Sequence, residues 1–117
     1  MNNLNTILVE GNLTKDPEIK YANNGTACGT LSIATNRYYK KDDNYETEVS
    51  YFDVKCYGKL AEACNQYLKK GRGIRCIGRL KQERWQTKDT NENRSKVVIM
   101  ADQIEFKPEY NKESDNG

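Results

Sequence analysis

Aromatic rings and positive charges alternate in the stretch that ends at Trp85, the single tryptophan of the chain. Side chains at every second position of a β-strand share one face. If residues 75–85 form a strand, one face presents cations and ends in the flat indole ring. The members of that face are Arg75, Ile77, Arg79, Lys81, Glu83 and Trp85. Rings that stack on unpaired bases, beside cations that neutralise phosphates, bind single nucleic-acid strands, so this face predicts such a partner.

A second stretch, 51–57, has the same pattern. One face would hold two tyrosines and a lysine and the other three apolar residues: Tyr51, Lys55 and Tyr57 against Phe52, Val54 and Cys56. The tyrosine face also carries Asp53 and is too polar for a core, so we expect it to be exposed. Burial at a subunit interface is the alternative use of these rings. A single tryptophan is also more often packed than exposed, but the cations beside Trp85 favour exposure.

Positive charge is concentrated rather than abundant. The chain has 19 basic and 17 acidic residues, and its net charge of +2 alone implies no nucleic-acid partner. Between Lys69 and Arg84, however, seven basic residues accompany one acid. Such a concentration attracts phosphate, although a solvated surface is the usual alternative for a charge run. The candidate phosphate contacts are Lys40, Lys59, Lys70, Arg79, Lys81 and Arg84.

Catalytic and metal-binding chemistry is not expected. The chain has no histidine, and its four cysteines lack the paired spacing of structural zinc sites. No spacing resembles a nucleophile with its base or a phosphate-binding loop, so we expect no enzyme activity and no cofactor. The cysteines lie in apolar runs, which indicates free core thiols in a reducing compartment: Cys28, Cys56, Cys64 and Cys76. No stretch is long enough to cross a membrane and no secretion signal is present, so we expect a cytoplasmic protein.

Hydrophobic periodicity predicts five strands and one helix. An apolar face from Leu60 to Leu68 indicates the helix, and Lys69, Lys70 and Gly71 predict its end. Residues 37–46 and 88–93 are polar and predict loops, the first of them a long, mobile hairpin loop. The strands are expected over 6–13, 26–36, 48–57, 73–85 and 94–106. This order indicates an all-β protein with the OB-fold, a five-stranded Greek-key barrel with one helix between strands 3 and 4.

Two of the expected strands are apolar on both faces, at 7–9 and 97–100. A small barrel has only one interior, so the second apolar face predicts burial against another copy of the chain. The barrel is expected to occupy residues 1–106 as one domain. Residues 107–117 are almost entirely polar, and we expect them to form a short disordered tail.

Several short segments then occur in an order typical of one family. They are Ile7-Leu8-Val9-Glu10-Gly11-Asn12-Leu13, Asp16-Pro17-Glu18, Asn24-Gly25, Leu31-Ser32-Ile33-Ala34-Thr35, Tyr57-Gly58-Lys59-Leu60-Ala61-Glu62, Tyr67-Leu68-Lys69-Lys70-Gly71, and Gly78-Arg79-Leu80 leading to Trp85. Any one of them is weak, but the set at these separations is specific. From about Leu4 to Phe106 the chain resembles the bacterial-type single-stranded DNA-binding proteins.

The resemblance implies an OB-fold protomer that assembles as a homotetramer, with a dimer as the alternative. It implies a protein that coats single-stranded DNA in replication, recombination and repair and has no catalytic residues. The base-stacking rings of the family fall here on Tyr39, Tyr51, Tyr57 and Trp85. Tyr39 and Tyr51 stand where the best-known members carry tryptophan. A tyrosine offers a smaller stacking face, so the affinity for each base is expected to be lower.

The end of the chain departs from the family. Family members commonly end in a long Gly/Pro/Gln-rich linker and an acidic tip that recruits repair proteins, whereas this chain stops at Gly117 without such a tip. We therefore do not expect recruitment through the tail, and we interpret the chain as truncated or as a divergent form from a phage or mobile element. Two other classes stay open: an RNA-binding or primosome-type OB protein, and a protein-interaction module.

Overall fold

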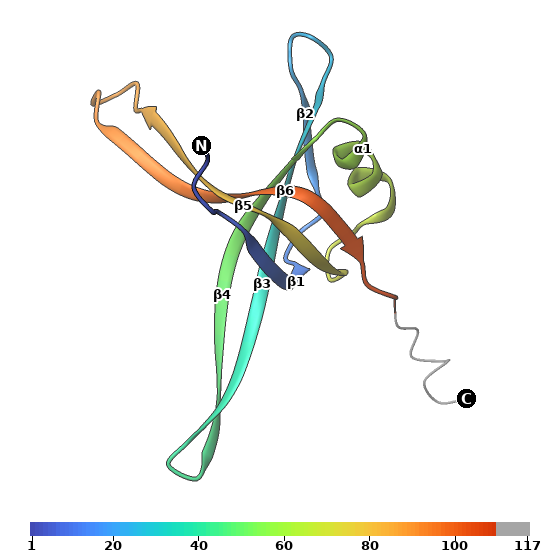
Figure 1. Ribbon diagram of the computed structural model, residues 1–117, viewed down its shortest axis with the longest axis vertical. Helices are drawn as coiled ribbons and strands as arrows, with labels where there is room; N and C mark the ends of the chain where they lie inside the picture. Colours follow the sequence, from blue (N-terminus) through green and yellow to red (C-terminus); the bar gives the residue numbers. More distant parts are fainter. Residues whose placement is uncertain (110–117) are drawn as a thin grey trace.

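The computed structural model describes residues 1–109, which form six strands and one helix (Figure 1). The strands are β1 (Ile7–Leu13), β2 (Glu18–Tyr21), β3 (Ala27–Lys41), β4 (Asn44–Tyr57), β5 (Gly73–Gln86) and β6 (Asn93–Phe106). The helix, α1 (Gly58–Tyr67), connects β4 to β5.

Five of the strands close into a barrel. Their order is β1-β5-β6-β4-β3, and β3 returns to β1 through the pairs Asn12↔Ala34 and Leu13↔Ile33. The pairings are antiparallel except that of β4 with β6, which run parallel. Helix α1 lies between the third and fourth barrel strands in chain order. The predicted OB-fold, a five-stranded barrel with one helix at this place, is confirmed.

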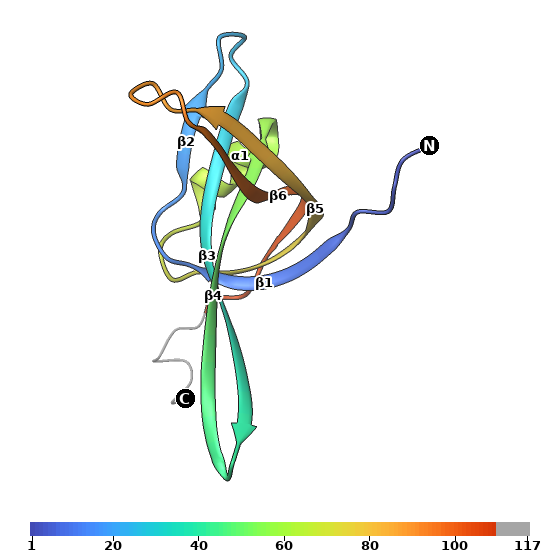
Figure 2. The ribbon, with the colours of Figure 1, turned by 90° about the vertical axis from the view of Figure 1, so that its left-hand side faces the viewer.

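Beyond the barrel, β3 and β4 continue as a long two-stranded ribbon (Figures 1 and 2). The predicted mobile loop over 37–46 is therefore wrong, because these residues pair one to one as far as Lys41↔Asn44. Asp42 and Asp43 close the ribbon with φ angles of 50° and 71°. Two successive positive φ angles make the two-residue hairpin turn whose twist matches paired strands. Both faces of the ribbon are exposed, so residues 37–46 lack the apolar core face by which strands are recognised.

Strand β2 was not expected from the sequence. It is four residues long and adds to the free edge of β3 by pairing with residues 27–30. Only Ile19 of this strand packs against the core. An exposed edge strand this short lacks the repeated apolar positions by which strands are recognised.

Apolar side chains at alternate positions of the strands fill the barrel. Leu31, Ile33 and Val54 are fully buried, and α1 covers one end of the barrel with Ala61 and Cys64. The prediction of free core thiols holds for Cys56, Cys64 and Cys76, which are buried, while Cys28 is half-buried. Burial raises the pKa of the Cys76 thiol to about 11, so this group stays protonated at neutral pH.

The predicted helix end at Gly71 is wrong, because α1 ends at Tyr67 and Leu68 is already extended. Leu68 is buried in the core, and this packing turns the chain away from the helix before the two lysines. Gly71, with a φ of 92°, instead donates its N–H to the carbonyl of Leu13 over 2.7 Å. Helix α1 is too short to span a membrane, and no other helix exists among residues 1–109.

The polypeptide still contacts the barrel where the predicted tail begins. The N–H of Lys107 donates to the carbonyl of Gly73 over 3.0 Å, and its ammonium group lies 2.6 Å from Oε2 of Glu10. The remainder of the predicted tail, residues 110–117, lies outside the described residues.

Candidate nucleic-acid interface

The outer face of the barrel at β3 and β4 carries two tyrosines. Cross-strand pairing places Tyr57 opposite Cys28 and Tyr51 opposite Ala34. Tyr51 is 72% exposed and Tyr57 45% exposed. The neighbouring positions on β4, Val54 and Cys56, point into the core, so the predicted separation of the two faces is confirmed. Phe52 follows the inward alternation as well, but it remains partly exposed.

The hairpin of β5 and β6 carries the tryptophan. Trp85 pairs with Arg94, Glu83 with Lys96, and Lys81 with Val98. In a sheet, directly paired residues lie on the same face. Trp85 is 48% exposed, and its face also holds four cations from the two strands: Arg79, Lys81, Arg94 and Lys96.

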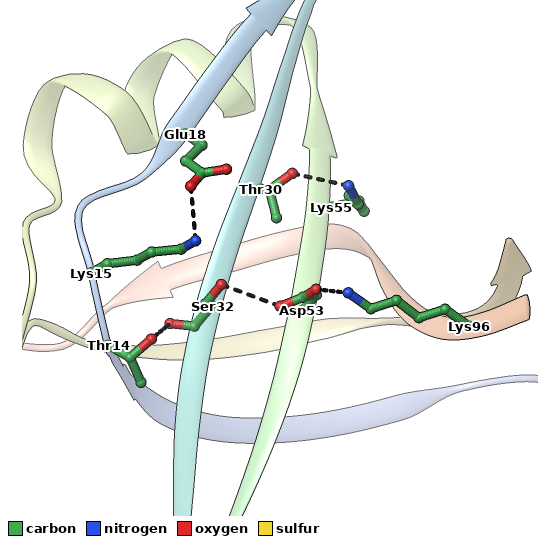
Figure 3. Close-up of polar contacts among 8 residues, drawn as sticks. All are labelled: Thr14, Lys15, Glu18, Thr30, Ser32, Asp53, Lys55 and Lys96. Atoms are coloured by element: carbon green, nitrogen blue, oxygen red, sulfur yellow. Dashed lines mark hydrogen bonds and ion pairs between the residues drawn. The ribbon is translucent and has the colours of Figure 1, made fainter. Parts of the chain in front are cut away.

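An ion pair joins the two faces. The ammonium group of Lys96, from the Trp85 face of the hairpin, bonds to Oδ2 of Asp53 on the outer face of β4 (Figure 3). The hydroxyl of Ser32 donates to Oδ1 of Asp53 over 3.2 Å. Partial burial acts to raise the pKa of Asp53, but the bonds from Lys96 and Ser32 outweigh it and lower that pKa below its usual range. Asp53 is therefore charged at neutral pH and holds the hairpin against β4.

Tyr57 lies near the charged groups of the hairpin. Its pKa is raised, first by burial and then by nearby acidic groups that include Glu83, while Arg79 acts in the opposite direction. Lys55, which shares the side of Tyr51 and Tyr57, pairs with Met100 of β6, and Met100 pairs with Arg79 of β5, so the tyrosines of β4 and the cations and tryptophan of β5 belong to one continuous surface. We call this surface the aromatic face: Tyr51, Lys55, Tyr57, Arg79, Lys81, Trp85, Arg94 and Lys96.

Tyr39 lies elsewhere. It pairs with Glu46 on the opposite face of the ribbon from Tyr51. Its hydroxyl donates to Oε2 of Glu46 over 2.9 Å, and the guanidinium group of Arg37 lies 5.0 Å from its ring centroid. The bond to Glu46 is the main reason that the pKa of Tyr39 is raised. The structure does not bring Tyr39 onto the aromatic face.

The six predicted cations are distributed over four places. Arg79 and Lys81 lie on the aromatic face, and Lys40 shares the Tyr51 side of the ribbon because it pairs with Tyr45. Arg84 falls on the reverse face of the hairpin, where its guanidinium group donates to Gln82 over 2.7 Å. It nevertheless lines one hollow of about 430 Å³ together with Trp85 and four other residues.

The other two cations belong to the helical end of the barrel. Lys59 is exposed near the start of α1, two residues after Tyr57. Lys70 lies in the turn after α1, where its backbone N–H donates to Oδ1 of Asp16 over 2.8 Å. Its side chain lines a separate hollow with Lys69, Arg72 and Lys107. The structure therefore does not bring Lys70 together with the aromatic face.

Two basic residues of the aromatic face were missed in the sequence. Arg94 and Lys96 stand at alternate positions of β6, which could have marked a shared face. Their positions opposite Trp85 and Glu83 depend, however, on the pairing of β5 with β6. Lys55 was visible between the tyrosines, and its ammonium group donates to Thr30 over 3.0 Å (Figure 3).

Known proteins resemble this chain in sequence and in fold. Residues 4–107 match the model of the single-strand binding protein family. A single-stranded DNA-binding protein of Borreliella burgdorferi is 41% identical over 106 residues, which cover 91% of this chain and 71% of that protein. One from Wolinella succinogenes is 42% identical over 103 residues, covering 87% of this chain and 63% of the relative.

A solved structure shares the fold. It is a Plasmodium falciparum SSB in complex with ssDNA, and it superposes with a TM-score of 0.83 at 23% sequence identity. The superposition covers 92% of this chain and 98% of that one. The barrel, the match over residues 4–107 and these relatives together show that the chain belongs to the single-strand binding protein family.

Proposed function

We propose that this protein binds single-stranded DNA without sequence preference. The observation that carries the proposal is the aromatic face, which combines three exposed rings with cations from three strands. Bases of an unpaired strand stack on the rings, and the lysines and arginines hold the phosphates. Duplex DNA is rejected because its bases are already stacked on one another. The barrel domain, residues 1–106, performs this binding, and no bond is made or broken, so no catalytic group is required.

The biological setting follows from the same activity. A protein that coats exposed strands protects them during replication, recombination and repair in the cytoplasm. The relatives described above are named for single-stranded DNA binding, which supports this proposal.

We further propose that the protein acts as a homo-oligomer, a homotetramer in the form that the family resemblance suggests. Strand β1 pairs with β5 from Ile7 to Asn12. With β3, on its other edge, it pairs only through Asn12 and Leu13. The carbonyl of Glu10 accepts from the hydroxyl of Thr35 over 2.7 Å, so the edge of β1 that is open to pairing with a second chain lies before Glu10. Leu8 on this strand is 70% exposed, and its burial would stabilise the contact.

Light scattering at working concentration measures the assembly. The expected mass is four times the 13.5 kDa of the chain, and twice that mass would indicate the dimer. A mass of one chain at all concentrations would contradict the oligomer while leaving DNA binding untouched.

A fluorescence titration of Trp85 with oligo(dT) tests the function. We expect strong quenching as bases stack on the indole, weaker binding at higher salt, and no reversal by duplex competitor. Unchanged emission, with no complex in a parallel mobility assay, would refute DNA binding. Competition with a matched RNA oligomer separates the RNA-binding alternative, since preference for RNA requires recognition of the 2′-hydroxyl.

A further inference from the structure

The ribbon of β3 and β4 has two chemically different faces. Pairing runs without a register shift from Cys28↔Tyr57 to Lys41↔Asn44, so the alternation of faces is unbroken along the ribbon. Four residues of the exposed part therefore lie on the same side as one another. We call them the ribbon ladder: Tyr38, Tyr45, Val49 and Tyr51.

The ribbon ladder is uncovered in the protomer. Tyr38 is 73% exposed, Tyr45 81% and Val49 42%. Tyr45 and Val49 are diagonal neighbours of Tyr38 across the ribbon, and Tyr51 follows Val49 at the next position on that face. Diagonal and same-strand neighbours on one face are about 7 Å apart, so each step of the ladder is about equal. Because the last step is Tyr51, the ladder continues the aromatic face outward.

Charge separates the two sides of the ribbon. The side opposite the ladder holds Arg37, Tyr39, Glu46 and Glu48, where Tyr39 is held by Glu46 and Arg37. The ladder side contains Lys40 and no acid between Ala34↔Tyr51 and Lys40↔Tyr45. On the Tyr39 side the two carboxylates are balanced by Arg37 and Lys41, whereas the ladder side presents Lys40 with no acid to offset it, so a phosphate backbone is attracted to the ladder side.

We propose that Tyr38 and Tyr45 are two further base-stacking platforms, which extend the single-strand binding surface along the ribbon. This inference rests on the proposed function and names residues of the same site. Single-stranded DNA is the occupant because the ladder joins Tyr51, lacks acids and presents three exposed tyrosine rings along one side of the ribbon. Tyr39, by contrast, braces the ribbon from behind through Glu46 and does not stack on a base.

Matched ring removals test the proposal. The double variant Tyr38→Leu/Tyr45→Leu removes both platforms but keeps two apolar side chains on the ribbon, and Tyr39→Leu is its control from the opposite face. With a long oligo(dT) of about 30 nucleotides, we expect the double variant to bind about tenfold or more weakly and Tyr39→Leu to bind within about twofold of the parent. With an oligomer of about 5 nucleotides, which occupies the aromatic face alone, the double variant should match the parent.

The outcomes separate this inference from the function itself. If the parent protein fails to bind oligo(dT), both proposals fall. If the parent binds and the double variant binds the long oligomer equally well, only the ladder is refuted. A double variant that instead changes the oligomeric mass would make the ladder a subunit contact and overturn the proposal.

A second measurement does not depend on how well the variants fold. Photocrosslinking of the parent protein to an oligomer containing 5-iododeoxyuridine joins a base to the ring on which it stacks. We expect peptides crosslinked at Tyr38 and Tyr45, together with those at Tyr51. Crosslinks at Tyr39 with none at Tyr38 would reverse the assignment of the two faces.

Discussion

Replacing Tyr51 and Trp85 together by leucine is expected to weaken binding of oligo(dT) by about 2–4 kcal/mol, roughly 30- to 1,000-fold. Each ring lies on a different hairpin, and each exposes a face to solvent: Tyr51 on β4 and Trp85 on β5. Because they are on separate elements, the losses from the two single variants should nearly add. Anisotropy of a labelled oligomer gives the dissociation constant, since the intrinsic fluorophore is removed with Trp85.

The salt dependence shows which interaction has been lost. Ring removal should lower the affinity and leave the slope of log K against log salt unchanged, because no phosphate contact is removed. Arg79→Gln should instead reduce the magnitude of that slope by about one, the contribution of one phosphate contact. Tyr21→Leu is the matched control, since Tyr21 is 64% exposed but lies on β2, away from the aromatic face. An unchanged affinity of the double variant would exclude both rings as platforms.

Replacing Gly78 by alanine is expected to destabilise the fold by about 3 kcal/mol. A Cβ at this position would overlap the carbonyl oxygen of Met100 and lie 2.9 Å from its carbonyl carbon. The close approach arises at the bulge in β6, where Ile77 pairs with Gln103 and Gly78 with Ala101. Both atoms in the overlap belong to backbone that closes the barrel, so they cannot move aside without breaking the pairing of β5 with β6.

Urea unfolding at a fixed protein concentration measures the loss of stability. Gly25→Ala provides the control, because Gly25 has a φ of 87° but no neighbour within 4 Å of a Cβ. Its cost should be about 1 kcal/mol, from backbone strain alone. Equal unfolding midpoints for the two variants would show that β5 and β6 can move apart at Gly78 without loss of stability, and would contradict the prediction.

The alternation of side chains between the two faces of a single strand is enough to predict much of the aromatic face. Tyr51 and Tyr57, and likewise Arg79, Lys81 and Trp85, share faces within a single strand, so the sequence places them without knowledge of pairing. The order of strands and helix was likewise enough for the fold, because few topologies join three strands, a helix and two strands.

The features that the sequence does not reveal depend on the pairing of strands far apart in the chain, or on strands that have no buried face. Arg94 and Lys96 join the aromatic face only through the register of β6. Residues 37–46 predict a loop because their composition is polar and no side of the ribbon is buried in the core. The resemblance identified Tyr39 as a stacking ring, whereas cross-strand register places Tyr38, and not Tyr39, on the side of Tyr51.

The closure of the barrel through β1 also has a consequence for the order in which the chain folds during synthesis. The β3–β4 hairpin joins neighbours across a two-residue turn and can form within microseconds of leaving the ribosome. Strand β1, in contrast, needs β5, since Ile7 pairs with Gly78 and Asn12 with Gly73. Until β5 emerges, the apolar inner side of the hairpin has no barrel to enclose it. The nascent chain is therefore most open to aggregation while α1 is emerging from the ribosome.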